Sequence, residues 1–249
     1  MNYLAFATLY DSLMEEAPYD EWKRFVINSV GPHRMKELSL LDVGCGTGEL
    51  VLKLLDEGVT VTGVDLSADM LVVAKEKCER AGYTPLLIQQ NMSKMPRLGE
   101  FDVVTVFCDS LNYLTTEDEV KRAFHCFAEQ LSKDGLLLFD VHSISKINDG
   151  FIGQTFADDR GDIAYIWTSF EGEFPNSVEH ELRFFVQNDS GLYDRYDELH
   201  KQRTFPVSSY ESWLEDAGFV IENISADFTE QPPHDESERI FIKARKKNK

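Results

Sequence analysis

The sequence predicts an α/β protein with a mostly parallel seven-stranded sheet, helices on both faces, and an antiparallel β insertion after strand five. Apolar strand-like segments alternate with amphipathic helical segments up to Val141, which is typical of a parallel sheet with right-handed crossovers. Three glycines at alternate positions follow the first strand. In residues 150–205, apolar and polar residues alternate as they do in strands, without a helical period. We therefore expect an N-terminal helical cap and α/β core (1–149), an antiparallel insertion (150–205) and a C-terminal completion of the core (206–249).

The predicted core elements follow one another regularly. A helix from Glu49 to Glu57 follows the first strand, Ser67 caps a second helix that ends at Ala81, and a capping box, Thr116–Glu119, begins a third. The strands before the insertion are Leu38–Val43, Val59–Asp65, Leu86–Gln90, Phe101–Phe107 and Leu136–Val141. After the insertion come a capping box from Ser208 to Glu211, a helix that ends at Gly218, and the strands Phe219–Phe228 and Glu238–Ala244.

The insertion is predicted to hold three strands, Asp162–Phe170, Val178–Gln187 and Tyr193–Thr204. Side chains alternate between the faces of a strand, so each strand has an apolar face. The apolar sets are Ile163, Tyr165 and Trp167 on one strand face, and Val178, His180, Leu182, Phe184 and Val186 on another. We expect one face to pack on the core and the other, with Arg183, Arg195, His200 and Arg203, to line a pocket. A dimer contact is the alternative.

The composition is that of an ordinary globular protein. The 249-residue chain is 43% hydrophobic, and its formal net charge of −19 disfavours nucleic acid or an anionic membrane as a partner. The four cysteines lack metal-ligand spacing, the N-terminus lacks a signal-peptide pattern, and no window approaches the roughly 20 apolar residues of a membrane span. We expect a cytoplasmic protein, a monomer or homodimer, with no metal and no membrane partner.

The glycine turn between the first strand and the first core helix is the strongest functional signal. Gly44, Gly46 and Gly48 leave the backbone bare at a helix N-terminus, where unpaired N–H groups can hold a ligand, although a purely structural turn is possible. The dinucleotide pattern Gly-x-Gly-x-x-Gly/Ala ends in a small residue where this chain has Glu49. A carboxylate suits the two positive groups of S-adenosylmethionine better than it suits two phosphates.

At these residues, with Asp42 before the glycines, the chain resembles the class I S-adenosylmethionine-dependent methyltransferases, whose first motif is an acidic residue, a spacer and Gly-x-Gly-x-Gly. The resemblance covers Leu38 to Val141 and the terminal strands, and it implies a Rossmann-like fold. It also implies that Asp65 holds the ribose hydroxyls, that Leu66 and Met70 flank the adenine, and that Asn91 replaces an aspartate that binds the adenine amino group. The implied cofactor-binding residues are Tyr19, Trp22, Asp42, Gly44, Cys45, Gly46, Thr47, Gly48, Asp65, Leu66, Met70, Gln90, Asn91, Met92, Phe107, Cys108 and Asp109.

Acceptor-side candidates follow the fourth and fifth strands, where open α/β sheets bind ligands. His142 is the predicted general base because of its position and near-neutral pKa range, and Tyr113 is a second catalytic candidate. A loop histidine bonded to backbone is the competing interpretation of His142. The N-terminal region is rich in aromatic residues: Tyr3, Tyr10, Tyr19 and Trp22. Either Tyr19 and Trp22 close the cofactor pocket, or these rings pack a leading helix, Asp20 to Val30, against the sheet.

We interpret the chain as a methyltransferase that moves the methyl group of S-adenosylmethionine to a small molecule by in-line displacement, leaving S-adenosylhomocysteine. The segment after strand four lacks the Asn/Asp-Pro-Pro-aromatic motif of enzymes that methylate bases or glutamine, which disfavours a nucleobase acceptor. The alternatives are an NAD-dependent oxidoreductase and a non-catalytic module that binds S-adenosylmethionine.

Overall fold

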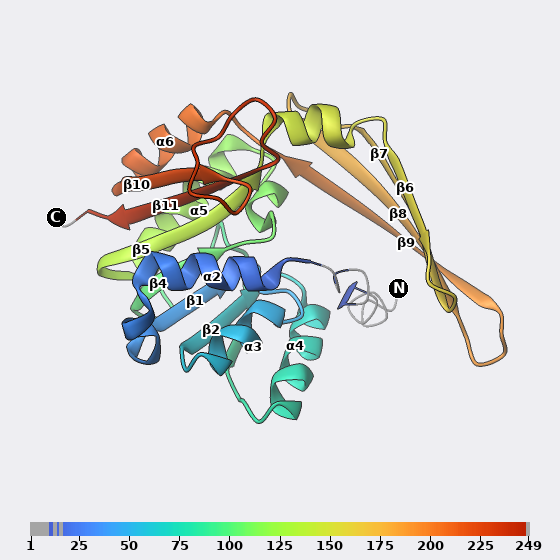
Figure 1. Ribbon diagram of the computed structural model, residues 1–249, viewed down its shortest axis with the longest axis horizontal. Coiled ribbons are helices and arrows are strands. Elements are labelled where there is room, and N and C mark those ends of the chain that lie inside the picture. The colour runs from blue at the N-terminus through green and yellow to red at the C-terminus, as the bar shows by residue number, and fades with distance from the viewer. Residues whose placement is uncertain (1–9, 12–13, 15–16, 248–249) are drawn as a thin grey trace.

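The computed structural model describes residues 10–11, 14 and 17–247, which form two β-sheets (Figure 1). The larger sheet has seven strands in the order β10-β11-β5-β4-β1-β2-β3. Strands β1 to β5 pair in parallel, whereas β11 is antiparallel to both β5 and β10. These strands are β1 (Ser39–Val43), β2 (Thr60–Asp65), β3 (Leu86–Gln89), β4 (Phe101–Val106), β5 (Leu131–His142), β10 (Phe219–Ala226) and β11 (Arg239–Lys246). Strands β2 and β3 lie on one side of β1, and β4 and β5 lie on the other. In open α/β sheets, ligands bind at the carboxyl ends of the strands where the strand order changes side in this way, which here is between β1 and β4.

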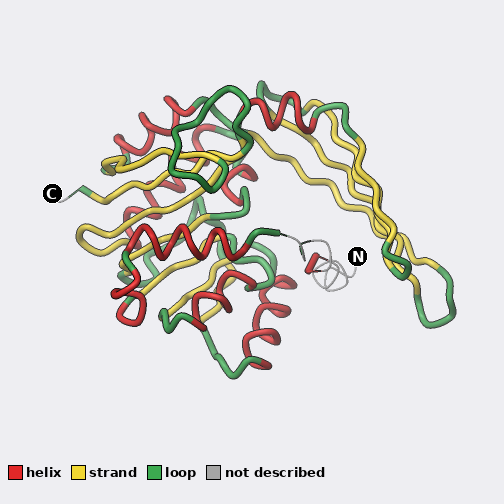
Figure 2. The backbone as a smooth tube through the Cα atoms, viewed as in Figure 1, coloured by secondary structure: helices red, strands yellow, loops and turns green. Residues whose placement is uncertain are grey.

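Helices cover both faces of this sheet, which confirms the predicted fold class (Figure 2). One face packs against α2 (Tyr19–Val30), α3 (Glu49–Asp56) and α4 (Ala68–Arg80), and the other against α5 (Glu117–Gln130) and α6 (Val207–Asp216). Short helices η1 (Pro32–Glu37), η2 (Ser110–Tyr113) and η3 (Lys146–Phe151) connect the longer elements.

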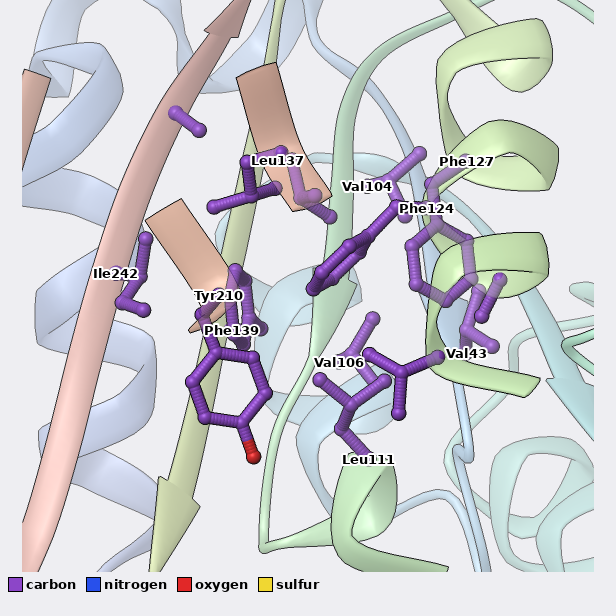
Figure 3. Packing of buried hydrophobic residues seen from close by; sticks show 14 of the residues in the cluster. Val43, Val104, Val106, Leu111, Phe124, Phe127, Leu137, Phe139, Tyr210 and Ile242 are labelled. Carbon is purple, nitrogen blue, oxygen red and sulfur yellow. The ribbon is translucent and has the colours of Figure 1, made fainter. Parts of the chain in front are cut away.

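Neighbouring residues of the central strands belong to opposite cores. Leu40 packs with the α2–α4 side and Leu41 with the α5–α6 side, as the alternation of side chains along a strand requires. Figure 3 shows the second core, in which Phe124 of α5 and Tyr210 of α6 flank Phe139 of β5. Burial on both faces explains why these strands are nearly continuous apolar runs.

The insertion forms a separate antiparallel sheet in the order β6-β7-β8-β9, which projects from the larger sheet as an arm (Figure 1). Its strands are β6 (Thr155–Asp159), β7 (Ile163–Glu171), β8 (Ser177–Gln187) and β9 (Tyr193–Arg203). The prediction of three strands was wrong because it missed β6. That strand is exposed along its whole length, so it carries no buried apolar alternation that would distinguish it from a loop.

The assignment of faces in the insertion was also wrong. The register pairs Trp167 with Leu182 and His180 with His200, so the apolar sets of β7 and β8 share one face with His200. The arginines Arg183, Arg195 and Arg203 lie on the opposite face. Sequence patterns define two faces for each strand, but only the register shows which faces coincide.

Two local predictions also need correction. Helix α6 begins at Val207 after Pro206, and no side chain caps it, so Ser208 is a residue of the first turn rather than an N-cap. Strand β5 begins at Leu131 rather than at Leu136, and it runs through Asp134, whose φ is +60°. Within the described part of the chain, no helix is both long and apolar enough to cross a membrane.

Candidate active site

The three glycines after β1 serve different purposes. All three have positive φ, between +53° and +78°, which favours glycine. A Cβ on Gly44 would lie 2.6 Å from the side chain of Ser110, and one on Gly48 would lie 2.9 Å from Cβ of Ala74 in α4. A Cβ on Gly46 would meet no protein atom within 4 Å. Gly44 and Gly48 thus permit close packing, whereas Gly46 leaves open space for a ligand.

Asp65, at the end of β2, is held in place by backbone donors. The N–H of Gly46 donates to Oδ2 at 2.8 Å, and the N–H of Ser67 donates to Oδ1 at 2.8 Å. Burial raises the pKa of this carboxyl group, and the backbone donors oppose that shift. The arrangement fixes the carboxylate beside the glycine turn, as expected for a residue that binds vicinal hydroxyls of a nucleoside.

Asp42 is a buried carboxyl group beneath the turn. It is 3% exposed, and Thr105 of β4 donates a hydrogen bond to its Oδ1 at 2.7 Å. Burial raises the pKa of Asp42 to about 7, against the effect of the Thr105 bond, and the Asp65 charge adds to the rise. The site therefore has a carboxyl group that a cationic ligand would ionise.

Glu49 is engaged by protein groups, which changes the argument based on it. Its Oε2 lies 3.1 Å from Nζ of Lys77 in α4, and the same ammonium lies 2.8 Å from Oδ2 of Asp11. Asp11 in turn accepts a hydrogen bond from Thr47. Lys77 thus partly neutralises the carboxylate that was expected to repel phosphates, and Asp11 links the N-terminal segment to the glycine turn.

A pocket lies over the turn and collects about half of the predicted cofactor-binding residues. It is lined by Tyr10, Tyr19, Trp22, Asp42, Gly44, Cys45, Gly46, Thr47, Leu50, Phe107, Cys108 and Ser110. Tyr10, Leu50 and Ser110 were not in the predicted set. Tyr19 and Trp22 both line this pocket and also pack with the α2–α4 core, as the second interpretation expected; that they close the pocket over a cofactor stays a prediction. Tyr3 lies outside the described residues.

The residues expected around the adenine lie outside that pocket. Leu66 is exposed, Met70 packs against Phe184, and Gln90 binds the Asp65 carbonyl through its backbone N–H. Met92 packs against the α5–α6 core. Asn91 uses its side-chain oxygen to accept two hydrogen bonds of 2.8 Å from Ser93.

A buried charge network joins the ends of β4, β5 and β11. Arg239 donates to Oδ2 of Asp140 at 2.5 Å and to Oδ1 of Asp109 at 3.1 Å. Trp22 donates to Asp140 at 2.9 Å, which connects the wall of the pocket over the glycine turn to the network. Burial opposes ionisation of Asp109, but the neighbouring His142 and Arg239 outweigh it and hold the pKa of that carboxyl group well below its usual range.

His142 lies at the centre of this region, where it was predicted. Its Nε2 is 3.4 Å from Oδ2 of Asp109, and it is 5% exposed. The strand end that carries it is fixed by Asn112, which accepts from the His142 N–H and donates to the Arg203 carbonyl of β9. His142 is therefore an oriented imidazole at the junction of the two sheets.

Cys108 and Asp109 adopt an unusual backbone conformation between β4 and η2. Their φ values are +55° and +51°, a region that non-glycine residues seldom occupy. This turn directs Asp109 toward Arg239, His142 and Gln202, whose Nε2 donates to Oδ2 at 2.7 Å. Burial raises the pKa of the Cys108 thiol, which keeps it neutral and argues against a nucleophilic role.

Tyr113 reaches the inserted sheet rather than the pocket over the glycine turn. Its hydroxyl lies 3.0 Å from Nδ1 of His200 on β9. The arm thus contacts the core near the acceptor-side candidates.

A wider groove of about 950 Å³ lies elsewhere, among residues that include Glu129, Leu131 and Gly218, and contains none of the predicted site residues.

Sequence reasoning missed Asp140, Arg239, Gln202 and His180 in this region. Asp140 and Arg239 are charged residues of opposite sign inside predicted core strands. Because a buried charge needs a partner, the sequence could have predicted that they form an ion pair. Gln202 and His180 carry no comparable signal, since their burial depends on tertiary contacts between the inserted sheet and the core.

Comparison with known proteins identifies the family. A family model described as "Methyltransferase domain" matches residues 40–135. The chain is 49% identical over 247 residues to the "Putative methyltransferase" of Geobacillus sp. (strain WCH70), covering 99% of this chain and 100% of that one. It is 28% identical over 193 residues to dTDP-3-amino-3,6-dideoxy-alpha-D-glucopyranose N,N-dimethyltransferase of Streptomyces fradiae, covering 76% and 73%.

A solved structure agrees with this result over the whole length. The crystal structure of an S-adenosylmethionine-dependent methyltransferase from Clostridium acetobutylicum ATCC 824 is 28% identical, covers 100% of both chains and has a TM-score of 0.87. The open space at Gly46 and the fixed carboxylate of Asp65 fit S-adenosylmethionine as the cofactor. The oxidoreductase and the non-catalytic module are thereby set aside, and the chain belongs to the class I S-adenosylmethionine-dependent methyltransferases.

Proposed function

We propose that this protein methylates an amino group of a small polar molecule held between the ends of β4 and β5 and the inserted sheet. One observation carries the proposal: the Asp109–His142 pair lies at the junction of these elements, and the same network holds Trp22 in the wall of the cofactor pocket. The similarity to an amino-sugar N,N-dimethyltransferase supports an amine acceptor.

When bound, S-adenosylmethionine supplies an activated methyl group that is transferred in line to the acceptor nitrogen, leaving a neutral thioether. Asp65, Gly46 and Asp42 would hold the cofactor through its hydroxyls, its close approach to backbone and its positive charge. The acceptor nitrogen forms the new bond with its lone pair and loses a proton, which His142 takes up. Asp109 orients that imidazole and stabilises its protonated form.

The inserted sheet acts as an acceptor lid in this proposal. Asn112 and Tyr113 connect η2 to β9, so the sheet and the base share one rigid support. Enclosure by the lid would exclude water and hold the acceptor in line with the methyl group.

The test replaces His142 by Phe and, as a matched control, the exposed His33 by Phe. Methyl transfer from labelled S-adenosylmethionine is measured with dTDP-3-amino-3,6-dideoxy-α-D-glucose and with a bacterial small-molecule extract. We expect His142→Phe to lower turnover by about 10²–10⁴-fold, the usual contribution of a general base, with cofactor affinity unchanged. Turnover equal to that of the wild type would remove His142 from the mechanism.

A further inference from the structure

Three imidazoles gather where the inserted sheet meets the core. His180 of β8 and His200 of β9 are directly opposite in the register, and His142 ends β5. The ring of Phe151 lies edge-on between two of them, with centroids 5.1 Å from His142 and 4.9 Å from His180. The proposed base uses only one of these imidazoles, so the others need a separate explanation.

The surroundings of His180 fix which of its nitrogens carries the proton. Trp167 donates its indole N–H to Nδ1 of His180 at 2.9 Å, and the hydroxyl of Ser169 lies 2.8 Å from the same atom. An indole nitrogen can only donate, so Nδ1 must accept. Burial, with the nearby His142, lowers the pKa of His180 to about 4, so the ring is neutral at pH 7. The single ring proton is therefore on Nε2.

That N–H has no hydrogen-bond partner among the described residues, although His180 is only 3% exposed. Its neighbours on the core side are the imidazole of His142 and Gln202, whose amide nitrogen donates to Asp109 and whose side chain raises the pKa of His180 without completing a well-aligned hydrogen bond to it. Most buried donors in proteins are paired, so an unpaired one beside a predicted active site indicates a place for a ligand atom.

We propose that the Nε2–H of His180 binds a neutral oxygen of the methyl acceptor, a hydroxyl or carbonyl close to the amine that is methylated. This inference rests on the proposed function. A neutral oxygen fits better than a carboxylate or phosphate, because Asp109 is ionised nearby and the guanidinium of Arg239 is already paired with Asp109 and Asp140. His180 thus selects the acceptor, whereas His142 takes its proton.

The first test needs no acceptor. In ¹⁵N-labelled protein with S-adenosylhomocysteine added, long-range ¹H–¹⁵N spectra report which nitrogen of His180 is protonated. We expect the Nε2–H form in the wild type and a mixture of both forms in Trp167→Phe, which lacks the indole donor. An Nδ1–H form in the wild type would overturn the inference, because Nε2 could then only accept.

The second test compares methyl transfer to a bacterial small-molecule extract by wild type, His180→Phe and His180→Gln. We expect His180→Phe to raise the extract concentration that gives half-maximal methyl transfer at least tenfold, with unchanged affinity for S-adenosylhomocysteine. His180→Gln, which places an amide N–H near the former Nε2, should recover part of the loss. The matched control is Arg195→Gln on the opposite face of the lid, which should behave as wild type.

The outcomes separate this inference from the proposed function. Equal transfer by wild type and His180→Phe would refute the role of His180 and leave the methylation proposal standing. A loss of cofactor binding in His180→Phe would also overturn it, since the residue would then act through the fold. No transfer by the wild type would refute the proposed function and the inference together.

Discussion

The two halves of the proposed site, one for the cofactor and one for the acceptor, are built in different ways. The cofactor half consists mostly of backbone, because the glycine turn, the N–H groups around Asp65 and the start of α3 come from one continuous stretch, residues 42–67. The acceptor half consists of side chains distant in sequence, such as Arg239 with Asp109 and Gln202 with Asp109. A backbone site depends on few residue types at fixed spacing, whereas a side-chain site depends on tertiary packing.

The largest expected effect tests whether the cofactor half depends on bare backbone. Gly46→Val should weaken binding of S-adenosylhomocysteine more than 100-fold, measured by calorimetric titration, because the side chain fills the open space and valine tolerates a φ of +53° poorly. Gly191→Val is the matched control: its φ is +77°, and a Cβ there also meets nothing within 4 Å, but it lies at the tip of the arm. Similar affinity in both variants would mean that the cofactor does not approach Gly46.

This contrast also explains what the sequence could predict. The sheet, the glycine turn and Asp65 follow from local periodicity and spacing, so they could be located without coordinates. His142 could be placed at the end of β5, but its contact with Asp109 depends on the left-handed turn at Cys108 and Asp109, which no local propensity indicates. His200 was placed on the wrong face of the inserted sheet, with the arginines, because only the register of β8 and β9 determines its face.

The second prediction addresses the acceptor half. Arg239→Met leaves the buried carboxylate of Asp140 and the largely buried one of Asp109 without their guanidinium partner, and we expect the free energy of unfolding to fall by about 3–5 kcal/mol. Urea denaturation measures the loss. In the folded fraction, affinity for S-adenosylhomocysteine should change by less than about fivefold, because Asp140 still accepts the Trp22 bond. Arg195→Met, which removes an exposed partner of Asp197, should be nearly neutral. An equal loss of unfolding free energy in both variants would show that the Arg239 ion pairs stabilise the protein no more than an exposed ion pair does.

The smallest expected effect concerns Asp42, the point at which the cofactor half also relies on a buried side chain. Its pKa is about 7 in the folded protein and about 3.9 in an unfolded chain, so between these values the folded state holds the extra proton. Stability should therefore fall as pH rises from about 4 to about 7, by roughly 2–4 kcal/mol in total.

Asp42→Asn should remove this slope in thermal or urea unfolding without cofactor, and should be more stable than wild type above pH 7. Thr105→Val, which removes the hydrogen bond that favours the ionised form, should extend the slope to higher pH. If the wild type and Asp42→Asn show the same pH dependence, Asp42 is already ionised in the folded protein, and the cofactor half needs no cation to charge it.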